Sequence, residues 1–250
     1  MAKITSSNGR ISGTIDGMTY YTRNGKNFVR RKRDSNKSSF DNDPKYARVR
    51  ENANEFKLVA NAKSLLMSAL RPITMNISDK TINSRLTKNL TVLKKLDLTS
   101  ERGMRNPLLS LDTADGKSVL KDFEFNAKSS LSNVLHKPHK FNELSGQVKI
   151  MGMTPKVHLS YPMGASHVMF QSSLAVIDLT TGDSEILQSN AVELPINNTP
   201  TNVELDIDET STISGLKLYI FQIIFLQEMN GGMYPLNNKT YNTSKIISVL

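Results

Sequence analysis

The side chains best suited to chemistry are cations near the N-terminus, interleaved with aromatic rings. Guanidinium and ammonium groups displace counterions from phosphates and rings stack on bases, so this composition suits a nucleic acid. The same cations suit an arm that docks on an acidic protein face, or a charged hairpin edge that resists aggregation, and we favour these interpretations. The cations are Arg23, Lys26, Arg30, Arg31, Lys32, Arg33 and Lys37, and the rings are Tyr20, Tyr21 and Phe28.

The four histidines predict neither a catalytic nor a metal site. His136 and His139 form the one close pair in the sequence, and a metal would need further ligands. Pro138 between them favours extended backbone, in which residues three apart do not share a face. We expect a solvated loop there, and outward-facing strand positions for His158 and His167.

Three carboxylates alternate with apolar residues late in the chain. Glu204, Asp206 and Asp208 lie two residues apart in a predicted strand, which places them on one face while Val203 and Leu205 enter the core. Calcium is the functional alternative, but a strand lacks the curved loop that encloses such an ion. We predict a solvated acidic strip that could equally receive a basic arm from another subunit.

Sequence motifs for catalysis are missing. The chain has no phosphate-binding glycine and lysine loop, no dinucleotide fingerprint, no nucleophile elbow and no zinc-protease helix motif. It also has no Cys, which excludes disulfides and thiolate metal ligands. We predict that the protein is not an enzyme and uses no cofactor or metal.

Two sequence observations bear on location. Residues 1–20 lack the three-part secretory pattern, and the apolar fragment LYIFQIIFL is far shorter than a membrane span. We expect synthesis in the cytoplasm without a signal peptide, no membrane span, and a final place in a particle or filament.

A basic β-hairpin arm is predicted at residues 1–40. Asp16-Gly17 and Asn24-Gly25 are turn dipeptides, and they predict a hairpin of residues 18–23 with residues 26–33. A lone hairpin buries too little apolar area to offset the cost of ordering it. The arm therefore needs a partner surface.

A helical pair is predicted at residues 41–97. Asp43 and Pro44 suit a helix start, and Arg71-Pro72 suits its end. The apolar face expected on this first helix is Val49, Ala53, Phe56, Ala60, Met67 and Leu70. The second helix begins near Ser78-Asp79 and should pack antiparallel to the first through Ile82, Leu86, Leu90 and Leu93.

The rest of the chain predicts a linker at residues 98–116 and a β-domain at residues 117–250. Turn residues with little periodicity mark the linker, and about seven short strands follow it. Strands at this spacing are typical of an antiparallel immunoglobulin-like β-sandwich. The predicted fold class is α+β.

Several blocks of the sequence resemble a family of Bacteroidota proteins. The blocks are GTIDGMTYYTRNGKNFVRRK, DPKYARVRENANEF, LLMSALRP, SRLTKNLT, LKDFEFN and FLQEMNGGMYPLNN. The likeness covers nearly the whole chain. It implies a bacterial or bacteriophage origin, and the family has no assigned function, fold or binding residues to carry over.

Charge is divided unevenly along the chain. Residues 1–110 carry 22 Lys and Arg against 9 Asp and Glu, whereas residues 111–250 carry 10 against 14. Basic and acidic halves can attract each other between neighbouring copies, or share the holding of a polyanion. The division supports a binding or assembly role.

We therefore predict a non-enzymatic structural protein that self-assembles as a virion, phage-like particle or filament subunit. Its basic arm adds hydrogen bonds to a sheet edge of a neighbouring copy and meets the acidic strip there. The alternative is a nucleic-acid-binding protein that holds phosphate with the arm and the helix lysines. The expected partners are other copies of the chain or, in the alternative, nucleic acid.

Overall fold

The computed structural model describes residues 3–4, 11–32, 37–208, 210–236 and 239–250. Two compact units divide the chain, Met1–Arg50 and Glu51–Leu250. Each unit has its own architecture, and the helix α2 (Ala47–Ala69) passes from the first into the second.

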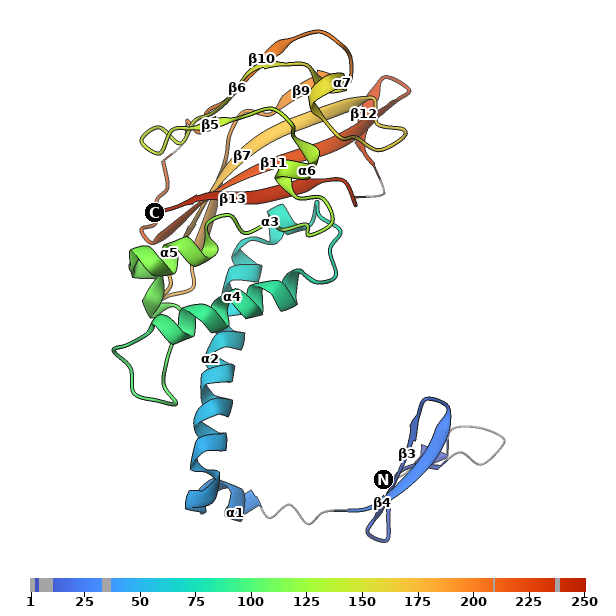
Figure 1. Ribbon diagram of the computed structural model, residues 1–250, viewed down its shortest axis with the longest axis vertical. Helices are drawn as coiled ribbons and strands as arrows, with labels where there is room; N and C mark the ends of the chain where they lie inside the picture. The colour runs from blue at the N-terminus through green and yellow to red at the C-terminus, as the bar shows by residue number, and fades with distance from the viewer. Residues whose placement is uncertain (1–2, 5–10, 33–36, 209, 237–238) are drawn as a thin grey trace. The chain divides into compact units, whose positions relative to one another are not determined.

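A four-stranded antiparallel sheet forms most of the first unit (Figure 1). Its strands are β1 (Lys3–Ile4), β2 (Ile11–Ile15), β3 (Met18–Arg23) and β4 (Lys26–Arg31), in that spatial order. Both predicted turns are confirmed: φ is positive at Asp16 and Gly17 and again at Asn24 and Gly25, as two-residue hairpin turns require. A short helix α1 (Lys37–Asn42) and a 3₁₀ turn η1 (Pro44–Tyr46) follow.

The limits of α2 agree with the sequence, but its buried face agrees only in part. Asp43 Oδ1 accepts a hydrogen bond from the Lys45 N–H at 3.0 Å, and a short helix α3 (Arg71–Thr74) follows the end of α2. Phe56, expected inside, is 62% exposed. The buried positions within α2 are Glu55, Val59, Ala62, Leu66 and Ala69. Of the expected residues, Leu70 is buried directly after the helix and Met67 packs against the same core. Apolar residues occur on two sides of α2, and periodicity alone does not decide which side the core takes.

Helices cover one face of the main sheet in the second unit. They are α2 beyond Arg50, α3, α4 (Ile82–Leu96), η2 (Leu109–Asp112) and α5 (Ala114–Leu120). The expected face of α4 is confirmed, since Ile82, Leu86, Leu90 and Leu93 are all buried. The expected antiparallel pairing with α2 is not seen, because the two helix axes cross instead of running alongside each other (Figure 1).

The expected linker at residues 98–116 is part of this core. Leu111 is fully buried, and Leu108 packs against the same cluster as α2 and α4. Residues 51–250 form one compact unit, so no domain boundary separates the helices from the strands. The segment lacks periodicity because it consists of turns and a 3₁₀ helix, not because it is exposed.

The main sheet is antiparallel and six-stranded. Its strands are β7 (His167–Ile177), β8 (Ser184–Gln188), β9 (Val192–Pro195), β11 (Leu216–Met229), β12 (Gly232–Pro235) and β13 (Thr243–Val249). Strand β11 pairs with β7 from Leu216↔Ile177 to Leu226↔His167, and with β13 and β12 on its other side. Both faces of β11 are covered, which explains why its apolar residues do not alternate with polar ones and are interrupted between Leu218 and Leu226 only by the buried Gln222.

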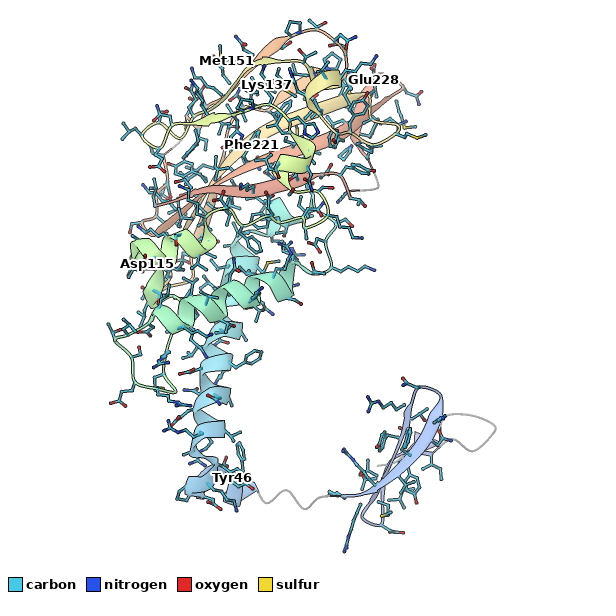
Figure 2. All side chains as sticks on the ribbon, in the orientation of Figure 1. Tyr46, Asp115, Lys137, Met151, Phe221 and Glu228 are labelled. Atoms are coloured by element: carbon cyan, nitrogen blue, oxygen red, sulfur yellow. The ribbon has the colours of Figure 1, made fainter. Side chains whose placement is uncertain are left out.

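A second, three-stranded sheet covers the other face of the main sheet. It contains β5 (Lys140–Phe141), β6 (Val148–Met153) and β10 (Thr201–Leu205), and the short helices α6 (Leu131–Val134) and α7 (Pro155–His158) flank it. Phe221 of β11 is fully buried between these layers (Figure 2).

The α+β class is confirmed, with 29% of residues helical and 34% in strands. The strands form antiparallel sheets, as expected. The immunoglobulin-like arrangement stays a prediction. Among the described helices, none combines the length and the apolar character that crossing a membrane demands.

Candidate assembly interface

Among the described side chains, the sheet of the first unit has no core of its own. Residues 11–32 contain β2, β3 and β4 of the predicted arm, and from here on the word arm means these residues. Every side chain in them is exposed or half-buried, and every residue of β4 is exposed. A small sheet without a buried face has little to offset its loss of conformational entropy. The arm is therefore the part of the described chain that calls for a partner.

One face of the arm is mainly apolar. Ile15 lies opposite Met18, and Tyr20 lies opposite Val29, and directly opposed residues project to the same side of an antiparallel sheet. Ile15 is 41% exposed and Val29 49%. These four residues are called the apolar face, and Arg31, opposite Met18, stands at its rim.

The other face combines rings with cations. Tyr21 lies opposite Phe28, with their ring centroids 5.6 Å apart and their planes at 22°. The Arg30 guanidinium is 5.5 Å from the centre of the Tyr21 ring. Arg23 lies opposite Lys26 on the same side, next to the turn. These five residues are called the cationic face.

The outer edge of β4 has no neighbouring strand in the described chain. The two-residue turn makes Arg23 and Lys26 a hydrogen-bonded pair, so every second residue of β4 turns its backbone groups away from β3. Those residues are Asn27, Val29 and Arg31. An edge of this kind can accept another strand.

Five of the seven predicted cations lie on the described arm. Arg30 and Arg31 project to opposite sides, as expected of neighbours in a strand. Lys32 continues β4, and its N–H donates to the Gly17 carbonyl at 2.6 Å. Arg33 lies outside the described residues, and Lys37 opens α1 with its side chain also outside them.

The predicted acidic strip is shorter than expected and already engaged. Strand β10 ends at Leu205, so Asp206 and Asp208 lie beyond it. Glu204 pairs with the Lys149 ammonium at 3.2 Å, and Asp206 accepts a hydrogen bond from the Gln147 amide.

The edge of β10 beside this strip is also covered. The Asn190 amide donates to the Glu204 carbonyl at 3.0 Å and accepts from the Asp206 N–H at 2.8 Å, much as a neighbouring strand would. This arrangement disfavours Glu204 and Asp206 as the place where an arm adds.

The four histidines do not gather in one place. His158 ends α7 instead of lying in a strand, and its Nδ1 accepts the Thr154 N–H at 3.0 Å, because Pro155 opens a helical turn there. His167 begins β7, as expected, beside Ser166.

His136 and His139 line a cavity of about 310 Å³ with Lys245. His136 Nε2 is 2.8 Å from Ser160 Oγ. Burial, and then Lys245, lowers the pKa of His139. No group of three or more candidate metal ligands occurs in the residues that the structure describes.

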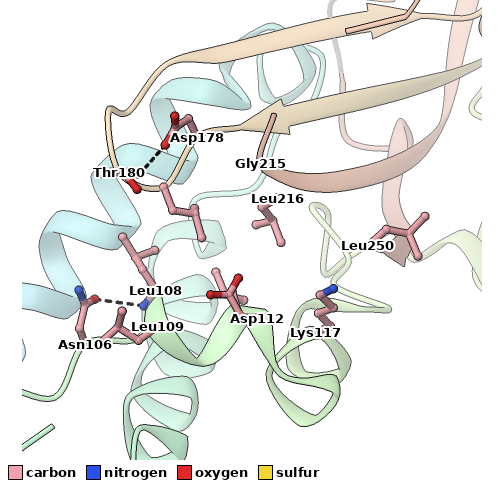
Figure 3. A pocket seen from close by; sticks show the side chains of 12 residues that line it. Asn106, Leu108, Leu109, Asp112, Lys117, Asp178, Thr180, Gly215, Leu216 and Leu250 are labelled. Atoms are coloured by element: carbon pink, nitrogen blue, oxygen red, sulfur yellow. Dashed lines mark hydrogen bonds between the residues drawn. The ribbon is translucent and has the colours of Figure 1, made fainter. Parts of the chain in front are cut away.

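A second cavity, of about 440 Å³, lies between η2, α5 and the end of β11's pairing with β7 (Figure 3). Its polar groups serve the loops around it: Asp178 accepts the Thr180 N–H at 2.7 Å, and Asn106 accepts the Leu108 N–H at 3.1 Å. Asp112 and Lys117 are the other ionisable side chains on its wall. No His, Ser, Cys or Tyr is among the residues that line this cavity.

The helix cations are partly neutralised within the second unit. Lys94 pairs with the buried Glu55 at 2.7 Å, and Arg85 pairs with Asp79 at 2.6 Å. Although burial alone would raise the pKa of Asp79, hydrogen bonds from Ala127, Thr81 and Arg85 hold it well below its usual range. These pairs weaken the expectation that the helices help the arm to hold phosphate.

Sequence reasoning missed a carboxyl group whose pKa is raised in the folded chain. Burial raises the pKa of Glu124 to about 7, against the opposing effects of the Leu131 N–H and the Lys245 ammonium. Glu124 bridges to Lys245 of β13 from a segment with no strand pattern, so no sequence signal could have found it.

Comparison of the chain with protein-family models, with curated proteins and with solved structures finds no match.

Proposed function

We propose that this protein is a non-enzymatic structural subunit that assembles with copies of itself through the arm. The observation that carries the proposal is the exposed apolar face of a sheet without a core. Phosphate binding alone would leave this face in water, whereas a protein surface removes it from water. A virion, a phage-like particle or a filament is the setting that we propose.

The energetics favour assemblies of many copies over a single tight contact. Completing the burial of one partly exposed apolar side chain contributes about 1 kcal/mol, so the four residues of the apolar face supply roughly 4 kcal/mol. The translational and rotational freedom lost on association costs at least about the same free energy. Pairing of the open β4 edge, or simultaneous contacts by several arms, must supply the rest.

Light scattering over a concentration series tests the proposal. We expect the full chain to form particles of higher mass than a protein that starts at Asp41. The double variant Ile15→Thr/Val29→Thr keeps β-branched side chains but removes apolar area, and should raise the concentration needed for assembly at least tenfold.

The matched control is Val92→Thr/Val157→Thr, which changes two exposed valines outside the arm. It should assemble like the unchanged protein. Equal masses for the full chain and the truncated protein at every concentration would remove the arm from assembly.

A further inference from the structure

We propose that the cationic face of the arm binds single-stranded nucleic acid, while the apolar face lies against protein. This inference goes beyond self-assembly and does not depend on it, because the two faces use different residues. It gives the assembled particle or filament a second ligand on its arms.

The rings on this face offer an open stacking surface. Tyr21 is 39% exposed and Phe28 42%, although both sit in the middle of their strands. The two rings stack on each other, with centroids 5.6 Å apart and planes at 22°, so a base would stack on the part of each ring that stays exposed. Each base that stacks on such a ring contributes about 1–3 kcal/mol, whatever its identity.

The cations stand where phosphates would follow stacked bases. Arg23 is two residues from Tyr21 and Lys26 is two from Phe28, which places each about 6.6 Å along its strand from the ring. This step is close to the length of one extended nucleotide. The Arg30 guanidinium lies over the Tyr21 ring, 5.5 Å from its centre, so it covers part of that ring and can itself stack on a base.

The charges of the arm are unopposed. Residues 11–32 contain five cations and a single carboxylate, Asp16. Within the described ranges no carboxylate pairs with Arg23, Lys26 or Arg30. Counterions therefore neutralise them in the free protein, and their release drives binding of a polyanion.

The exposed rings favour a single strand over a duplex or an acidic protein. A duplex already stacks its bases on one another, and its base faces are closed to protein rings. An acidic protein surface would satisfy the cations but would not need two flat rings beside them. A single strand uses both features.

Fluorescence anisotropy with a labelled oligothymidine of about 20 nucleotides tests the proposal on the full chain. Tyr21→Ile/Phe28→Ile should weaken binding at least tenfold, since two stacking contacts are lost. Arg23→Gln/Lys26→Gln should weaken binding and lower the slope of log affinity against log salt by roughly 1.4, at about 0.7 for each phosphate contact. The control Lys88→Gln/Lys95→Gln removes two exposed charges of α4 and should change neither quantity.

Intrinsic fluorescence gives a readout that does not rely on a disruptive variant. The chain has seven Tyr and no Trp, so stacking on Tyr21 should quench part of its emission. Tyr21→Phe keeps a ring and should bind with unchanged affinity but smaller quenching. Ile15→Thr/Val29→Thr should keep its affinity for the oligonucleotide.

Three results would overturn the proposal. The first is absence of binding near physiological salt. The second is equal affinity for polyglutamate, which would assign the face to an acidic protein. The third is full affinity in Tyr21→Ile/Phe28→Ile, which would reduce the site to a general attraction for polyanions.

Discussion

Glu124 shows how a single carboxyl group can tie the stability of the second unit to pH. Its pKa is raised from an ordinary 4.5 to about 7, because the folded chain buries it. The folded state therefore keeps a proton that the unfolded state releases between these values. The stabilisation is complete below pH 4.5 and is lost as the pH rises through 7.

We predict that Glu124→Gln removes this pH dependence. Glutamine resembles the protonated acid, so the variant should match the unchanged protein near pH 4.5 and exceed it at pH 8. Because the side chain is still 20% exposed, solvent screening limits the gain to about 1–2 kcal/mol. Urea unfolding at both pH values measures it.

The control for this measurement is Glu228→Gln, at an exposed glutamate of β11. Its unfolding free energy should differ from that of the unchanged protein by the same amount at both pH values. A constant offset for Glu124→Gln as well would show that the buried carboxyl group is not the source.

Two ion pairs in the second unit should differ in strength. Glu55 is buried and accepts hydrogen bonds from Lys94 at 2.7 Å and from the Gly103 N–H at 2.9 Å. The hydrogen bond from Lys94 holds the pKa of Glu55 below its ordinary value. Lys94→Met leaves this carboxylate buried without its cation and should cost about 3 kcal/mol. Lys149→Met breaks the exposed pair with Glu204 and should cost less than about 0.5 kcal/mol. Similar losses in urea unfolding for the two variants would contradict this assignment.

At the scale of elements, the orientation of α2 makes its own prediction. Leu66→Ala opens a cavity in the core and should cost about 3 kcal/mol. Phe56→Ala removes a larger side chain but an exposed one, and should cost less than about 0.5 kcal/mol. Chemical denaturation measures the loss of unfolding free energy in each variant. A larger loss for Phe56→Ala than for Leu66→Ala would favour the buried face expected from the sequence.

Local features of the elements could be predicted, and features that depend on distant contacts could not. The two hairpin turns and the limits of α2 follow from residues within a few positions, such as Asp43 and Pro44, and they are confirmed. The face of α2 and the burial of residues 98–116 depend on strands more than a hundred positions away. The arm was located from turn chemistry and charge, but its division into two faces needed the register of all three strands.

At the scale of the whole molecule, the two compact units predict independent stability. A protein that starts at Asp41 keeps all of the residues 51–250 and both core clusters. Its thermal midpoint, measured at concentrations below assembly, should lie within about 2 °C of that of the full chain. A much lower midpoint would mean that the arm stabilises its own second unit, and would weaken the case for a contact between copies.

The central place of β11 has a consequence for how the chain is made. On the ribosome, α4 is complete at Leu96, but β11, which covers the helices from the sheet side, begins only at Leu216. Because synthesis adds about 5–20 residues per second, roughly ten seconds pass between completion of α4 and synthesis of that strand. Their apolar sides are open to chaperones and to neighbouring nascent chains during this interval. A premature stop just before β11 would release a polypeptide whose helices lack the β11 and β13 residues of their core cluster.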